Sequence, residues 1–92
     1  MRYTLVLSDE ALKGLDKWKR SGQMKILLKI ARIFDELEEH PYVGIGHPEP
    51  LKGGNSDKWS RQIDKKNRIV YTVKDMILQV DVITVIGHYE DK

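Results

Sequence analysis

The alternation of apolar and polar positions predicts that the chain begins with one strand followed by a helix. Residues 3–7 (YTLVL) form a β-branched and apolar run of the length of one strand. Ser8 follows as the expected helix N-cap, and the two acidic residues after it suit the positive end of a helix dipole. Apolar residues then recur at helical spacing, which predicts a first helix that begins at Asp9 and ends at Lys19 or Arg20.

A second and longer helix is predicted over residues 23–39. Residues 21–22 (Ser-Gly) separate it from the first helix, and Pro41 disfavours helical backbone at the residue before it. Its apolar residues form two adjoining stripes, so the helix is expected to contact two partners. On the narrow polar face, Arg32 and Glu36 are expected to form an ion pair worth roughly 0.2–0.5 kcal/mol. The two stripes consist of Met24, Leu27, Leu28, Ala31 and Phe34, and of Ile26, Ile30, Ile33 and Leu37.

The second half of the chain begins with an irregular loop and continues with strands. Residues 41–57 contain all three prolines and four of the seven glycines, and a loop of this length in a small domain is more often functional than idle. Three strand-like runs follow at 58–63, 68–73 and 76–86, joined by segments short enough for hairpin turns. This order predicts a single α+β domain over residues 1–92, with both helices on one face of a twisted, mainly antiparallel sheet. The place of the first strand in the sheet is left open.

Composition narrows the class of protein. A chain of 92 residues with 40% hydrophobic and 33% charged residues fits one globular domain. It has no cysteine, which excludes disulfides, and its three histidines lack HExxH spacing, so neither a metal nor another cofactor is expected. Nucleotide hydrolysis and serine hydrolysis have no support, because a phosphate-binding glycine loop and a nucleophile elbow are both missing. The apolar runs are too short for a signal peptide or a membrane span, so a cytoplasmic protein is the default expectation.

The charge distribution and three separated side chains suggest RNA chemistry. Residues 49–68 hold six basic and three acidic residues, which is expected for a phosphate-binding surface, although a merely solvated hairpin explains it about as well. Glu49 lies between two prolines on a stiff backbone, Arg68 opens a strand, and His88 lies near the end of the chain. Taken singly, each is more ordinary as a surface or terminal residue. Together they supply the base, the cation and the acid that metal-free RNA cleavage requires.

Four segments of the chain resemble the YoeB/Txe branch of the RelE toxin superfamily. They are residues 46–52 (GHPEPLK), 58–63 (KWSRQI) and 67–73 (NRIVYTV), and the near-terminal pair His88-Tyr89. The resemblance spans essentially the whole chain and implies a RelE-like fold. It also implies a bacterial endonuclease that cleaves mRNA at the ribosomal A site without a cofactor. The implied partners are the 70S ribosome and a cognate antitoxin of the YefM/Axe type, and a homodimer is left open.

The resemblance also implies a role for individual residues. Glu49 corresponds to the general base, His88 to the general acid, and Arg68 to the cation that stabilises the pentacoordinate phosphate. Lys52, Arg61 and Tyr89 are assigned to binding of the RNA or its phosphates. Two departures from the family pattern stand out: Gln62 replaces a second arginine, and residues 90–92 extend the usual His-Tyr end. Because adjacent strand residues face opposite sides of a sheet, Arg61 cannot simply replace that missing arginine, and weaker ribosome or phosphate binding is expected.

Two non-catalytic interpretations remain beside the endonuclease. Toxins resembling ParE share this general fold and act on DNA gyrase by binding, and a plain RNA- or ribosome-binding module would show salt-dependent binding without strand scission. The joint presence of Glu49, Arg68 and His88 favours the enzyme. That interpretation requires the three side chains to converge around one phosphodiester.

Overall fold

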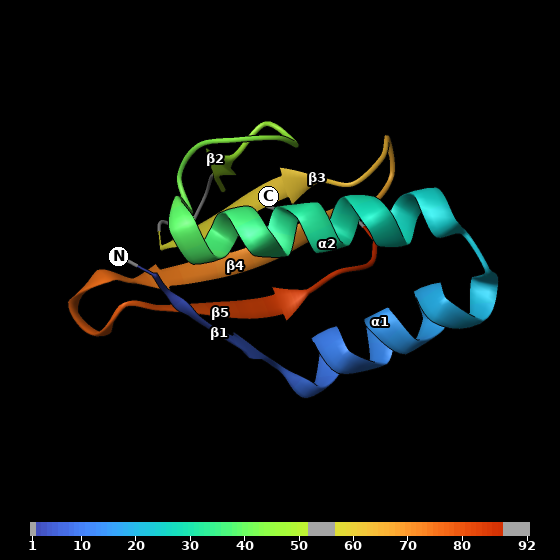
Figure 1. Cartoon of the computed structure of the whole chain (residues 1–92), viewed down its shortest axis with the longest axis horizontal. Helices are drawn as coiled ribbons and strands as arrows, with labels where there is room; N and C mark the ends of the chain where they lie inside the picture. The colour runs from blue at the N-terminus through green and yellow to red at the C-terminus, as the bar shows by residue number, and fades with distance from the viewer. Residues whose placement is uncertain (1, 52–56, 88–92) are drawn as a thin grey trace.

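The computed structural model describes residues 2–51 and 57–87 and shows one strand, two helices and four further strands (Figure 1). The elements are β1 (Thr4–Leu7), α1 (Asp9–Ser21), α2 (Met24–Glu39), β2 (Glu49–Pro50), β3 (Lys58–Gln62), β4 (Arg68–Lys74), a 3-10 turn (Asp75–Ile77) and β5 (Gln79–Thr84). The predicted α+β fold is confirmed. Within the described ranges, no helix has the length and apolar character needed to cross a membrane.

The first helix begins and ends at the residues that its sequence predicts, within one position. The Ser8 hydroxyl accepts a hydrogen bond from the Ala11 N–H at 3.0 Å and donates one to the Ile83 carbonyl at 2.6 Å. Gly22 ends the helix in the left-handed conformation with φ of 71°, which glycine adopts without a Cβ penalty. Ser8 therefore caps α1 and also ties its first turn to the sheet.

The sheet contains five strands in the order β1-β5-β4-β3-β2. The first strand lies at one edge and pairs in parallel with β5, while the other neighbours are antiparallel. A bulge between β4 and β5 pairs Tyr71 with Val82 but Val70 with Thr84, which changes the face on which the following residues of β5 lie. Val85 consequently joins Val82 in the core.

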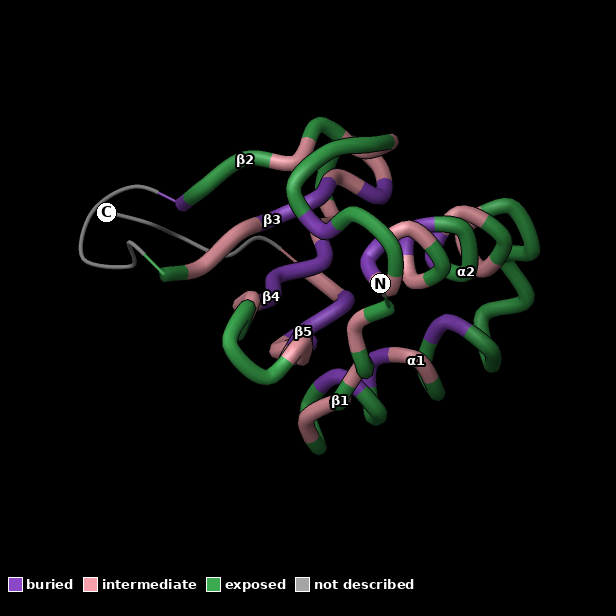
Figure 2. The backbone as a smooth tube through the Cα atoms, turned by 60° about the vertical axis from the view of Figure 1, so that its left-hand side comes forward, coloured by how far each residue is buried: buried purple, intermediate pink, exposed green. Residues whose placement is uncertain are grey.

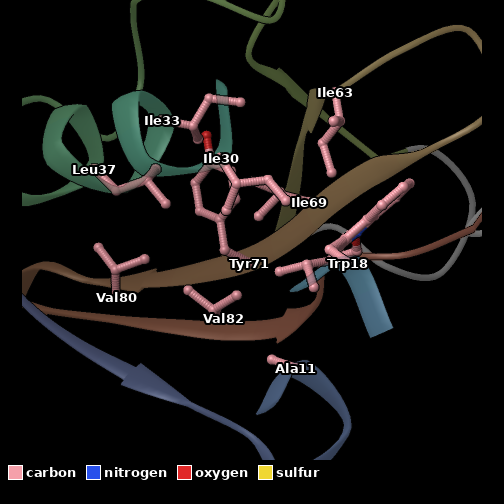
Figure 3. Packing of buried hydrophobic residues seen from close by; sticks show 11 residues of the cluster. Ala11, Trp18, Ile30, Ile33, Leu37, Ile63, Ile69, Tyr71, Val80 and Val82 are labelled. Carbon is pink, nitrogen blue, oxygen red and sulfur yellow. The ribbon is translucent and has the colours of Figure 1, made fainter. Parts of the chain in front are cut away.

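Both helices cover the same face of the sheet, and the core lies between these two layers (Figure 2). Side chains from both helices and the three central strands meet there (Figure 3), and Trp18 also donates a 2.9 Å hydrogen bond to the Val85 carbonyl. The buried cluster consists of Ala11, Trp18, Ile30, Ile33, Leu37, Ile63, Ile69, Tyr71, Val80, Val82 and Val85. The predicted single-face packing of the helices is confirmed.

Three details of the predicted elements are corrected. α2 packs against α1 and β1 as expected for two partners, but Met24 and Leu28 in its first stripe remain 63% and 62% exposed. The run at 76–86 starts with the 3-10 turn, and Leu78 has a left-handed φ of 50°, so the strand begins only at Gln79. The expected loop at 41–57 contains the short strand β2, which forms the edge of the sheet opposite β1.

Candidate functional site

Two of the predicted catalytic side chains, those of Glu49 on β2 and Arg68 on β4, meet over the strand between them, β3. Nη1 of Arg68 lies 3.2 Å from Oε1 of Glu49 and 3.2 Å from the hydroxyl of Ser60. The pairing explains this contact, because Glu49 of β2 is opposite Ser60 of β3, and Arg68 of β4 is opposite Gln62 of β3. Residues 19 positions apart along the chain are thus brought together by two antiparallel neighbours of one strand.

These groups lie on the face of the sheet away from the helices. Along β3, Ser60 and Gln62 alternate with side chains that point to the helix layer. The Glu49 side chain is 58% exposed and that of Arg68 is 28% exposed, so the carboxylate is open to solvent and the guanidinium is partly sheltered. Among the described residues, Nε and Nη2 of Arg68 have no hydrogen-bond acceptor. The site can therefore offer further N–H donors to an anion while Nη1 stays with Glu49.

The chain segment that leads to His88 is bound beside Arg68. The backbone N–H of Arg68 donates to the Gly87 carbonyl at 3.3 Å, and the Gly87 N–H donates to the side-chain oxygen of Asn67 at 2.8 Å. Asn67 is held in turn by Asp64, whose carboxylate accepts from the Asn67 N–H at 2.7 Å. Burial raises the pKa of Asp64, but the hydrogen bonds from residues 66 and 67 outweigh it and hold the pKa below its usual value. Lys52, His88 and Tyr89 lie outside the described residues.

Arg61 is absent from this face, and its predicted contact with RNA is wrong. Its side chain is 0% exposed, points toward the helix layer and forms a 2.6 Å ion pair with Glu36 of α2. The predicted pair between Arg32 and Glu36 is wrong for the same reason, because the Glu36 carboxylate turns inward to Arg61. The strand period explains the error: Arg61 has the same parity as Trp59 and Ile63, which both pack against the core.

The burial of Arg61 also changes the charge of the predicted phosphate-binding surface. One of the six basic residues in 49–68 is neutralised inside the protein, and Lys58 lies 4.0 Å from the Asp57 carboxylate. Lys65 and Lys66 are exposed at the turn before β4. Among the described residues, Arg68 is the one that carries a guanidinium on the face of the site.

Sequence reasoning missed three residues that shape the site. Ser60 binds the Arg68 guanidinium, Asn67 binds the backbone of Gly87, and Glu36 holds Arg61. Ser60 could have been found from strand alternation, since it shares a face with the residue paired to Arg68. Asn67 and Glu36 carry no comparable pattern, because their partners lie 20 and 25 residues away along the chain.

The fold and the site together define a class of small bacterial toxins. The YoeB/ParE toxin from Agrobacterium tumefaciens is similar in structure, with a TM-score of 0.86 and 31% identity over 94% of this chain and 99% of that chain. The YoeB dimer from Staphylococcus aureus gives a TM-score of 0.80 at 28% identity, over 97% of this chain and 100% of that chain.

Sequence comparison identifies the family. Toxin YoeB from Escherichia coli O6:H1 is 37% identical over 71 residues, which is 77% of this chain and 83% of the relative. Toxin YoeB from Synechocystis is 38% identical over 63 residues, or 68% of this chain and 73% of the relative. The family model described as YoeB-like toxin of bacterial type II toxin-antitoxin system matches residues 7–89. The chain belongs to this YoeB-like toxin family, as its sequence motifs predict.

Proposed function

We propose that this toxin is a ribosome-dependent endoribonuclease that cleaves mRNA in the A site and so inhibits translation. The observation that carries the proposal is the 3.2 Å contact between Glu49 and Arg68 on the open face of the sheet. A carboxylate and a guanidinium held together there provide a proton acceptor and a phosphate-binding cation at one place. The binding of Gly87 beside Arg68 gives further support, because His88 follows Gly87 directly in the chain.

The proposed reaction is an attack by the 2′-hydroxyl group of the RNA. Glu49 accepts the 2′-hydroxyl proton, and the oxygen forms a bond to the adjacent phosphorus. Arg68 binds the non-bridging oxygens and stabilises the charge of the pentacoordinate phosphate. His88 donates a proton to the 5′-oxygen as its bond to phosphorus breaks. The products are a 2′,3′-cyclic phosphate, which water can open to a 3′-phosphate, and a 5′-hydroxyl end.

Gln62, where the chain departs from the family pattern, is the strand partner of Arg68. Gln62 is half-buried and is paired with Arg68 in the strand register, so it lies on the same face as the proposed phosphate. A neutral amide at this position supplies hydrogen bonds but no charge. We therefore expect weaker stabilisation of the phosphate than an arginine would give. Lys52 and Tyr89 are proposed to hold the RNA by a phosphate contact and by stacking.

The proposed partners are the 70S ribosome with its A-site mRNA and a YefM-like antitoxin. A site with so little positive charge on its face binds free RNA weakly, whereas a ribosome presents the mRNA in a defined orientation. For the antitoxin, the support is a relative: a YoeB–YefM complex from S. aureus is similar to this chain, with a TM-score of 0.76 at 28% identity. The S. aureus YoeB dimer supports a homodimer as a further proposal.

The test compares cleavage of mRNA on programmed ribosomes by the wild-type protein and three variants. Glu49→Gln and His88→Ala each remove one proton-transfer group and should lower the cleavage rate at least ~10²-fold. Glu10→Gln makes the same chemical change at an exposed glutamate in the first turn of α1 and should cleave at the wild-type rate. Wild-type speed in either active-site variant removes that residue from the mechanism. Ribosome binding without new RNA ends would instead support a binding module, and gyrase inhibition would support a ParE-like toxin.

A further inference from the structure

We propose that Arg61 is a positioning residue, which together with Glu36 fixes the loop that carries Glu49. This inference rests on the proposed cleavage of RNA, in which Glu49 is the base. Arg61 lies on β3 between Ser60 and Gln62 but points to the opposite side of the sheet. It touches neither Arg68 nor the open face, so it would act on the reaction through the loop alone.

The Arg61 guanidinium binds the loop at several backbone carbonyls. A guanidinium has five N–H donors, and the structure supplies five acceptors for it although the side chain is 0% exposed. The acceptors are the carbonyls of Val43 (2.8 Å), His40 (3.0 Å) and Ile45 (3.5 Å), the Glu36 carboxylate (2.6 Å) and the Tyr71 hydroxyl (3.4 Å). Tyr71 extends the same network, since its hydroxyl donates to the Pro41 carbonyl at 2.7 Å.

Glu36 completes the clamp from the helix side. Its Oε1 accepts hydrogen bonds both from Arg61 and from the Ile45 N–H, the latter at 2.9 Å. Burial raises the pKa of Glu36, but the Ile45 hydrogen bond and the Arg61 contact outweigh it and bring the pKa below its ordinary value. Gly44 has a φ of 132°, and a Cβ there would overlap the Glu36 carboxylate and lie 2.9 Å from Nη1 of Arg61. The loop therefore follows the contour of this ion pair closely.

The clamped part of the loop leads directly to Glu49. The Gly46 carbonyl accepts a 2.6 Å hydrogen bond from the Gln62 N–H, and three residues later Glu49 enters β2. This strand has two residues, and Pro50 has no N–H to donate, so the pairing of β2 by itself fixes Glu49 weakly. The contacts of Arg61 and Gly46 thus set the distance between the Glu49 carboxylate and the phosphate site. A displacement of ~1 Å at such a group can cost ~10²-fold in rate.

Arginine is required for this role because of its shape. Lysine keeps the positive charge beside Glu36 but has three donors on one nitrogen, and it cannot reach carbonyls on both sides of a planar fork. Arg61→Lys therefore keeps the buried charge and weakens the loop contacts. The double substitution Glu36→Gln with Arg61→Met removes both charges, so neither is left unpaired, but it also removes the donors to the carbonyls of His40, Val43 and Ile45.

The experiment measures kcat and KM on programmed ribosomes, the melting temperature, and amide hydrogen exchange at Ile45 and Gln62. Arg61→Lys should lower kcat ~10- to 100-fold with little change in KM, and both amides should exchange faster. The Glu36→Gln/Arg61→Met protein has no unpaired buried charge but leaves the loop carbonyls without their donor, so it should melt below the wild type and, at a temperature where it is folded, keep the low kcat. Arg2→Lys is the matched control, because it makes the same change at an exposed ion pair, and it should leave kcat and both amides unchanged.

Several results would overturn the inference. A folded double variant that cleaves with the wild-type kcat would show that Arg61 and Glu36 serve stability alone. Unchanged kcat in Arg61→Lys despite faster exchange, or lower kcat with unchanged exchange, would break the link between loop and catalysis. If Arg61→Lys does not fold, the double variant alone decides. Wild-type protein that leaves ribosome-bound mRNA uncut would refute the proposed function and the inference with it, whereas cleavage by wild type and all variants alike refutes only the inference.

Discussion

The contact between Gly44 and Glu36 leads to a quantitative prediction about stability. A methyl group added at Gly44 would overlap the Glu36 carboxylate, which then has to leave its 2.6 Å contact with Arg61. The same substitution also places alanine at a φ of 132°, a conformation that L-residues rarely adopt. These two costs can be separated by making Gly44→Ala both in the wild-type protein and in Glu36→Ala, because the second background has no carboxylate to displace.

The free-energy cost of each of these two effects can be estimated from the burial of the ion pair and the backbone angle of Gly44. Loss of one partner of a buried ion pair costs ~3–5 kcal/mol, which we reduce to about 2–3 kcal/mol because Glu36 is 22% exposed and Arg61 keeps its carbonyl acceptors. The unfavourable φ costs ~1–3 kcal/mol. Gly44→Ala should therefore cost ~3–6 kcal/mol, and the double variant should cost the same, because the ion pair is lost only once. The losses in the free energy of unfolding of Gly44→Ala and Glu36→Ala, added together, should therefore exceed the loss in the double variant by ~2–3 kcal/mol.

Urea unfolding followed by tryptophan fluorescence measures all four proteins, provided that they share one m-value. Trp18 is buried in the core and reports global unfolding. If the losses in the free energy of unfolding of the two single variants add up to that of the double variant within ~0.5 kcal/mol, the reasoning is refuted, because independent sites behave in that way. Such additivity would mean that the methyl group at Gly44 does not displace the Glu36 carboxylate.

Two further predictions concern the pKa of Tyr42 and the N-cap of α1. Burial together with the hydrogen bond to Asp75 and its charge raises the pKa of Tyr42 from 10.0 to about 12. Because the pKa is raised in the folded state, Tyr42 stabilises the protein fully below pH 10, and this contribution is lost as the pH rises to about 12. Asp75→Asn should move the pKa of Tyr42, followed by ultraviolet absorbance, part of the way back towards 10. An unchanged pKa in Asp75→Asn would show that Asp75 does not contribute to the raised pKa of Tyr42. Ser8→Ala removes the cap of α1 and the bond to Ile83, and should cost ~1–2 kcal/mol in thermal unfolding, whereas a loss below ~0.5 kcal/mol would show that water replaces both contacts.

The residue types of the candidate site can be predicted from the sequence, but the face on which each side chain lies depends on the strand period. Chemistry and the family motif point to Glu49 and Arg68, and the structure brings these two side chains into contact at 3.2 Å. The same reasons assign Arg61 to RNA, although its position between Trp59 and Ile63 in the strand period indicates an inward side chain. A motif shows which residues occur together, but the strand period decides which of them share a face.

The sequence by itself determined the order of the elements, the N-cap at Ser8 and the antiparallel pairing of β3 with β4. These features depend on helix periodicity, capping and turn length, which act over a few neighbouring residues. Only the tertiary structure decided that β1 pairs in parallel with β5, that Glu36 neutralises Arg61, and that Gly87 lies beside Arg68. Each of those contacts joins segments at least 19 residues apart, and such pairs form only when the helices pack on the sheet and bury their apolar faces together.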